Sequence, residues 1–231
     1  VVKFPYMDNY NYHKGMNGII QELTGLLKTK NIGTDSDRAL LLDFQATLET
    51  KPEKAIKLEK DALAQIETIT ADNARLVSNL HANLGGLYRM NAHPDLAREH
   101  MEKSISLLDQ FNLLHINDSI PQIANYAMFL TEQQEPERGI SELQKLSGII
   151  KEYHSDHCLD YAKVQETLGT IYLMTANLPQ AKTHFKRAFK IYEKIWADEP
   201  EMIEAKYQEI QELYPQIGFC IGKNLSGLLT K

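Results

Sequence analysis

Residues 168–188 read LGTIYLMTANLPQAKTHFKRA, and this stretch decides the fold of the chain. Asn177-Leu178-Pro179 divides it, and proline suits the first turn of a helix because its missing N–H would have no partner there. On either side, small, apolar and aromatic residues stand at helical spacing: Leu168, Gly169, Tyr172, Ala181, Phe185 and Ala188. The stretch therefore predicts two packed helices joined by a short turn.

The same pattern recurs upstream at a fixed period. Pro52, Pro94 and Pro136 are spaced 42 residues apart, and a small residue follows three places after each: Ala55, Ala97 and Gly139. Pairs upstream of the prolines keep the same spacing: Leu84-Gly85, Tyr126-Ala127 and Leu168-Gly169. Small residues recur where helices cross closely, since a large side chain would push the axes apart. A period of this kind indicates an array of similar helical units.

The array is expected to contain four helix pairs and no sheet, since no alternating pattern is long enough for one. We expect first helices at Ser36–Glu49, Ala71–Met90, Ser119–Glu132 and Asp156–Thr175. Second helices are expected at Pro52–Ile69, Pro94–Asn112, Pro136–Tyr153 and Leu178–Ala197. Candidate N-caps are Asp35, Ser119 and Asp156.

The repeats are expected to span residues 36–197, between two capping regions. Residues 1–35 hold a capping helix or a truncated repeat at Tyr12–Lys30, and residues 198–231 hold capping helices at Glu201–Leu213 and Gln216–Leu229. The first repeat departs most from the pattern, at Asp43, Ala46 and Glu59. Terminal repeats carry a more polar outer face, so we expect this repeat to act as a cap.

Leu-Gly-x-x-Tyr followed by a small, an aromatic and a further small residue resembles the tetratricopeptide repeat. That repeat is usually about 34 residues long, and the longer period here resembles its kinesin light chain type. Asn83-Leu84-Gly85, Asn125-Tyr126-Ala127 and the Asp156-His157 pair carry this second resemblance. The resemblance covers Ser36 to Ala197 and implies an all-α, right-handed superhelical solenoid of helix-turn-helix repeats with capping helices.

Composition narrows the class of protein. The chain has 231 residues, a formal net charge of -6 and no basic block, which disfavours nucleic acid as a partner. Apolar runs such as Ala39 to Leu42 are too short to span a membrane. Cys158 and Cys220 form no disulfide pattern, so we expect a reducing, cytoplasmic location. The chain starts at Val1 rather than at Met, from which we expect an excised fragment or a processed form.

Catalytic and metal chemistry is not expected. A structural zinc site needs four ligands at defined spacing. The one cluster of possible zinc ligands reads instead as a turn between repeats: His154, Asp156, His157, Cys158 and Asp160. Because adjacent residues on a helix point apart, His157 is not placed to activate Cys158 as a nucleophile. Gly85-Gly86 lies within a helix pattern and is not followed by the Lys-Ser/Thr of a phosphate loop. We therefore expect no enzyme, no cofactor and no metal.

The resemblance implies that the first helices line a concave groove that binds a protein or peptide. The candidate groove residues are Asn79, Asn83, Arg89, Asn125, Met128, Lys163, Thr167 and Thr170. Asn83 and Asn125 are favoured for binding because asparagine is a costly choice inside a helix. We expect a scaffold or adaptor; the alternatives are a peptide-sensing domain of a larger signalling or transcriptional regulator, and an enzyme built on the array. Oligomeric state stays open.

Overall fold

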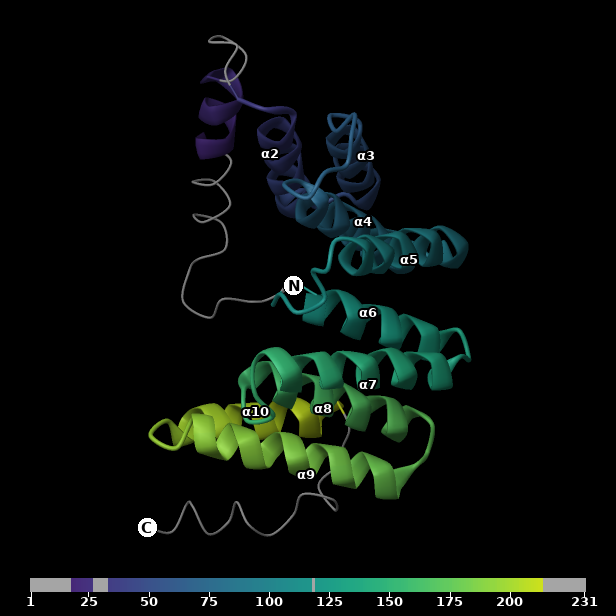
Figure 1. Ribbon diagram of the computed structural model, residues 1–231, viewed down its shortest axis with the longest axis vertical. Coiled ribbons are helices and arrows are strands. Elements are labelled where there is room, and N and C mark those ends of the chain that lie inside the picture. Colours follow the sequence, from purple (N-terminus) through teal and green to yellow (C-terminus); the bar gives the residue numbers. More distant parts are fainter. Residues whose placement is uncertain (1–17, 27–32, 118, 214–231) are drawn as a thin grey trace. The chain divides into compact units, whose positions relative to one another are not determined.

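The structure is a computed structural model that describes residues 18–26, 33–117 and 119–213. In these ranges the chain forms helices and no strands, so the all-α prediction is confirmed (Figure 1). The first helices of the repeats are α2 (Asp35–Leu48), α4 (Ala74–Met90), α6 (Ser119–Glu132) and α8 (Leu159–Met174). The second helices are α3 (Pro52–Leu63), α5 (Pro94–Gln110), α7 (Pro136–Tyr153) and α9 (Leu178–Ile195). They are followed by α10 (Pro200–Leu213), and residues 18–26 are also helical.

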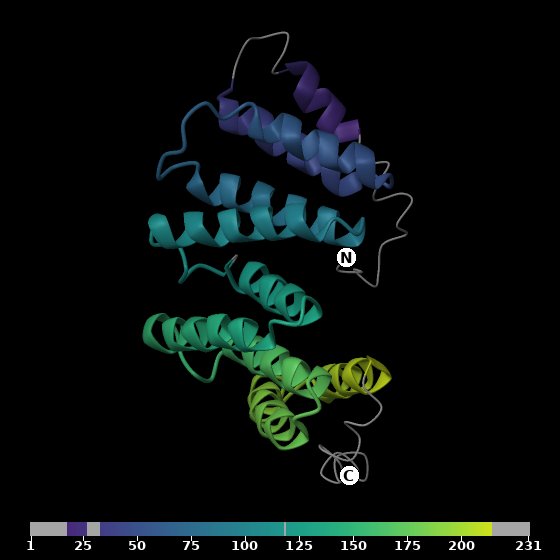
Figure 2. The same cartoon turned by 90° about the vertical axis from the view of Figure 1, so that its right-hand side faces the viewer.

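The chain forms two compact units that divide between Leu113 and Leu114. The first unit contains α2 to α5, and the second contains α6 to α10. Within each unit every helix packs against the next, as α4 and α5 do in both views (Figure 1, Figure 2). The first helices of neighbouring repeats also touch, α2 with α4 and α6 with α8. Each unit therefore presents a side built from two first helices.

Close helix crossings explain why small residues recur with the period of the repeat. A Cβ atom added to Gly85 would lie 2.6 Å from Cγ of Met101, and one added to Gly169 would lie 2.9 Å from the ring of Phe185. Cβ atoms do not approach other atoms that closely, so a larger residue would force α4 from α5 or α8 from α9. The small residues that face these crossings, Ala97 and Ala181, are buried as the period predicts.

The turns inside the last three repeats share a backbone conformation that the sequence does not predict. Ala92, Gln134 and Ala176, again 42 residues apart, all have positive φ, between 56° and 65°. The residue after each donates its N–H to a carbonyl five residues back, as His93 does to Tyr88 at 2.9 Å. This is the Schellman ending of a helix, normally made with glycine. This ending directs the chain into the second helix of the repeat, which has a proline in its first turn.

Several predicted helix ends and caps are wrong. The helix that begins at Pro52 ends at Leu63 rather than at Ile69, and the connection that follows is held by Asn73, which accepts from the Thr70 N–H at 2.8 Å. Thr34 caps α2 in place of Asp35: its hydroxyl accepts from the N–H of Asp37, whose carboxylate accepts from the Thr34 N–H.

The predicted caps of two later helices are also corrected. Cys158 caps α8 in place of Asp156, since its sulfur accepts from the Tyr161 N–H at 3.4 Å. Ser119 is the first residue of α6, and its hydroxyl donates to the carbonyls of Leu114 and Ile116. The predicted helix at Gln216–Leu229, and Cys220, lie outside the described residues, as do the ends of the one at Tyr12–Lys30.

Candidate functional site

The candidate residues of the second unit share one accessible side of two adjoining helices. Asn125 and Met128 are three residues apart on α6, while Lys163, Thr167 and Thr170 are spaced by four and three residues on α8. Residues at this spacing lie on one face of a helix, and all five are exposed or half-buried. Because α6 and α8 touch, we treat the five together and call them the α6/α8 face.

The α6/α8 face carries side chains that suit a peptide backbone. Asn125 is exposed and makes no hydrogen bond to the described residues, so its amide group is free to donate and to accept. The Thr167 hydroxyl donates to the Lys163 carbonyl at 3.0 Å and still has lone pairs to accept with. The Lys163 ammonium lies 3.7 Å from the Asp160 carboxylate, an exposed pair that costs little to separate.

The candidates of the first unit all lie on α4, and one of them is already engaged. Asn79, Asn83 and Arg89 fall within that helix. The Asn83 amide nitrogen donates to Oδ1 of Asp43 on α2 at 2.8 Å, and to Oε1 of Glu59 on α3 at 3.2 Å. Both amide hydrogens are therefore committed, and the Asn83 carbonyl oxygen remains for a ligand. Asn83 and Asn125 belong to different units, so each is considered by itself.

Asp43, which is half-buried, and Glu59, which is buried, form a carboxyl pair that the sequence did not predict. They occupy, one period earlier, the positions at which Gly85 meets Met101. Glu59 is only 2% exposed, and among the described residues its Oε2 has no hydrogen-bond partner. Burial, followed by the charge of Asp43, raises the pKa of Glu59 to about 9, and burial also raises the pKa of Asp43. Glu59 therefore lies inside the helix crossing, at the position that is apolar in the other repeats, and the capping role of this repeat stays a prediction.

A set of half-buried ring contacts recurs in alternate repeats of the array. Tyr88 stacks on His100 with ring centroids 5.4 Å apart, and Tyr172 stacks on His184 at 5.3 Å. Nδ1 of His100 lies 2.9 Å from Nδ1 of His81, so one ring must donate and the other accept. Burial, above all, lowers the pKa of both histidines, that of His81 to about 4, which favours the neutral rings that this contact requires.

The histidines and cysteine near the start of α8 have separate partners. The His154 Nε2 atom lies 2.9 Å from the His115 carbonyl oxygen, and His157 pairs with Asp156 at 2.9 Å. Cys158 is occupied as the cap of α8. In the described ranges no three His, Cys, Asp or Glu residues come together in a way that could hold a metal ion.

Comparison with known proteins identifies the repeats. Residues 119–194, from the start of α6 to near the end of α9, match the family model of the tetratricopeptide repeat. These residues are tetratricopeptide repeats. No curated protein matches the sequence of the chain. In the described ranges no helix is both long enough and apolar enough to cross a membrane.

Solved tetratricopeptide-like structures extend the likeness over most of the chain. BtubC from P. vanneervenii superposes with a TM-score of 0.71 at 17% identity, covering 92% of this chain and 85% of BtubC. A kinesin light chain of Podospora anserina with nearly identical tetratricopeptide-like repeats gives 0.63 at 15% identity, covering 82% and 93% of the two chains. MamA gives 0.54 at 16% identity, covering 82% and 97%. The expected kinesin light chain type of tetratricopeptide fold is thereby confirmed.

Proposed function

We propose that the α6/α8 face binds an extended segment of a partner protein, and that the chain serves as a non-enzymatic scaffold or adaptor. The tetratricopeptide fold itself points to a protein-interaction scaffold. The observation that favours this face is the Asn125 amide, which is exposed and has no partner among the described residues. Asparagine lowers the stability of a helix, so its presence within α6 calls for a reason such as binding.

The spacing of the face supports an extended peptide. Asn125 and Thr167 occupy the same place in neighbouring repeats, 42 residues apart. Packed helices lie about 8–10 Å apart, and an extended chain rises about 3.3 Å per residue. One step from α6 to α8 therefore matches roughly three peptide residues. Asn125 both donates and accepts, as a peptide group requires, and Thr167 offers an acceptor at the next step.

The first unit is proposed to contribute in the same way through α4. Asn79 and Arg89 would supply polar contacts, and Asn83 would accept a peptide N–H at its carbonyl oxygen while its amide hydrogens hold Asp43 and Glu59. Asn83 is thus a poorer reporter of binding than Asn125, because its loss also disturbs the helix crossing.

Selection of ligands from a peptide library, followed by affinity measurements, tests the proposal. Asn125→Ala and Thr167→Val are each expected to weaken a selected peptide by about 0.5–1.5 kcal/mol, roughly two- to tenfold in Kd. Gln144→Ala, an exposed change on the second helix α7, is the matched control and should leave Kd unchanged. Peptides that bind both face variants as tightly as the unaltered protein would rule out this face.

A further inference from the structure

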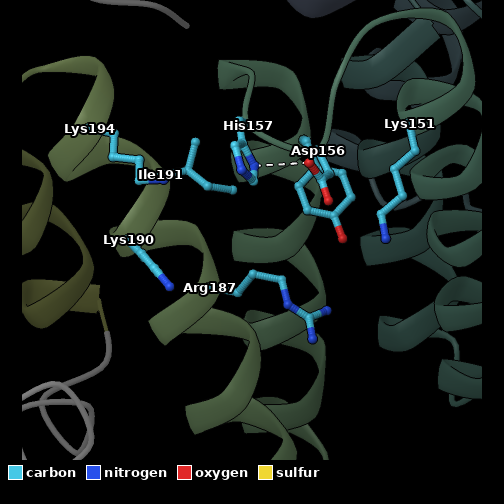
Figure 3. Close-up of a pocket in the computed structure, with 8 residues that line it drawn as sticks. Lys151, Asp156, His157, Arg187, Lys190, Ile191 and Lys194 are labelled. Carbon is cyan, nitrogen blue, oxygen red and sulfur yellow. Dashed lines mark ion pairs between the residues drawn. The ribbon is translucent and has the colours of Figure 1, made fainter.

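A pocket in the second unit has a cationic lining that the proposed peptide face does not explain. Its volume is about 360 Å³, and it lies where the end of α7 and the start of α8 meet α9. Four permanent cations line it, Lys151 from α7 and Arg187, Lys190 and Lys194 from α9 (Figure 3). On α9 they recur every three or four residues, so they occupy one side of that helix.

The pocket lining carries more positive than negative charge. Among the described residues none of the four cations forms an ion pair with a carboxylate. Asp156 is the acidic residue in the lining, and it pairs with His157 at 2.9 Å, as the dashed line in Figure 3 shows. In a chain whose net charge is -6, this local surplus of cations creates a positive potential that attracts anions.

Two of the cations are held in position before any ligand arrives. The Lys151 ammonium lies 5.2 Å from the centre of the Tyr161 ring, and Nη1 of Arg187 donates to Oε1 of the buried Gln165 side chain at 3.1 Å. Tyr161 and Ile191 are only 3% and 5% exposed, so they form a fixed wall behind the charged groups. A pre-positioned guanidinium suits the oxygens of phosphate, which it binds by parallel hydrogen bonds.

We propose that this pocket binds a phosphate group, either free or carried on a partner chain. A volume of about 360 Å³ falls at the small end of known ligand pockets, about 300–1,000 Å³, and leaves room for a phosphate group. Single-stranded nucleic acid is disfavoured, since it needs an open aromatic face on which bases stack. The Tyr161 ring is buried and carries the Lys151 ammonium instead.

The pocket is distinct from the α6/α8 face. Tyr161 and Lys163 are two residues apart on α8, which places their side chains about 200° apart around the helix. Tyr161 is buried at the pocket wall, whereas Lys163 is exposed on the face. Changes in the pocket can therefore be tested without touching the residues proposed to hold a peptide.

The test is an NMR titration of the whole chain in about 0.15 M salt, where the Debye length of about 8 Å screens diffuse surface attraction. The probes are inorganic phosphate, a glycine- and serine-flanked phosphoserine peptide, and the same peptide without phosphate. Lys190→Gln with Lys194→Gln removes two pocket cations. Lys182→Gln with Lys186→Gln is the matched control, since both residues are exposed on the same helix but outside the pocket lining.

We expect both phosphate probes to shift amide signals of residues 156–161 and 187–194, and the unphosphorylated peptide to shift none. The pocket variant should weaken binding at least about tenfold, and the control variant less than about twofold. Binding of the phosphopeptide alone would support the proposal and identify a chain-borne phosphate as its source. The absence of binding by both phosphate probes, or an equal loss in the two variants, would overturn it.

Discussion

The amide nitrogen of Asn83 lies 2.8 Å from Oδ1 of Asp43, and it donates to Glu59 at 3.2 Å as well. One side chain of α4 therefore joins both helices of the preceding repeat. In the next repeat the equivalent crossing is filled by Gly85 against Met101. The first repeat has exchanged an apolar contact for a polar one, in which Asn83 donates to one oxygen of each acid.

Removal of the Asn83 amide should destabilise the fold, because two carboxyl groups lose a donor and one of them, Glu59, is buried. We expect Asn83→Ala to lower the free energy of unfolding by about 1–3 kcal/mol. Asn125→Ala is the matched control, since Asn125 has no hydrogen bond to the described residues and should change stability little. Urea denaturation of the two variants measures both effects. An equal change in both would show that Asn83 does not hold this crossing.

The buried pair should make stability depend on pH above the acidic range. The pKa of Glu59 is 4.5 when unperturbed and about 9 in the fold, so the folded chain keeps a proton that the unfolded chain loses. The contribution of the protonated Glu59 to the free energy of unfolding is fully present below pH 4.5. It is lost as the pH rises toward about 9, at up to about 1.4 kcal/mol per pH unit.

Glu59→Gln tests this dependence, because a carboxamide keeps the shape of the protonated acid without titrating. The variant should be the more stable protein at pH 8, and its advantage should shrink as the pH falls toward 5. Thermal unfolding at matched pH values measures the difference. A difference that stays constant over this range would exclude a retained proton on Glu59.

Two adjacent glycines should respond in opposite directions to the same change. A Cβ at Gly85 would meet Met101 and the backbone of α5, whereas a Cβ at Gly86 would have no atom within 4 Å. We expect Gly85→Ala to cost about 1–3 kcal/mol by overpacking, and Gly86→Ala to gain about 0.5–1 kcal/mol by favouring the helix. Chemical denaturation of both variants decides the matter. Stabilisation by Gly85→Ala would contradict the crossing described for α4 and α5.

Ending the chain at Ala197 should expose the outer side of α9. Ile203 and Ile210 of α10 are buried, and the Tyr207 ring packs edge-on against Phe189 at 6.1 Å. The shortened chain should bind a hydrophobic dye and melt at a lower temperature. Ile210→Ala should cost about 2–5 kcal/mol, whereas Met202→Ala, which is largely exposed, should cost far less. A soluble shortened chain with an unchanged Tm would show that α10 is not a cap.

The sequence predicts much of this fold because proline and small residues act locally. Both ends of α6 and α7 fall where the sequence places them. The early end of α3 was missed because the connection after it is held by side-chain contacts, such as that of Asn73 with Thr70, which periodicity does not register. The ends at Ala92 and Ala176 carry no glycine, so their turns gave no signal.

The sites were less predictable because they join distant residues. Helical spacing alone places the five residues of the α6/α8 face on accessible surface, although their binding stays a prediction. The hydrogen bonds from Asn83 to Asp43 and Glu59 depend on the meeting of three helices. Their one signal in the sequence is that two acids stand where the other repeats carry a small residue and an apolar residue. The cationic pocket gathers residues from Lys151 to Lys194, which no short motif connects.

NMR mapping of a library-selected peptide on the labelled chain tests most directly whether the α6/α8 face holds a peptide. We predict the largest amide shift changes at residues 125, 128, 163, 167 and 170, with the exposed residues of α7 and α9 unaffected. Perturbations confined to the second helices α7 and α9, with the α6/α8 face unchanged, would contradict the claim.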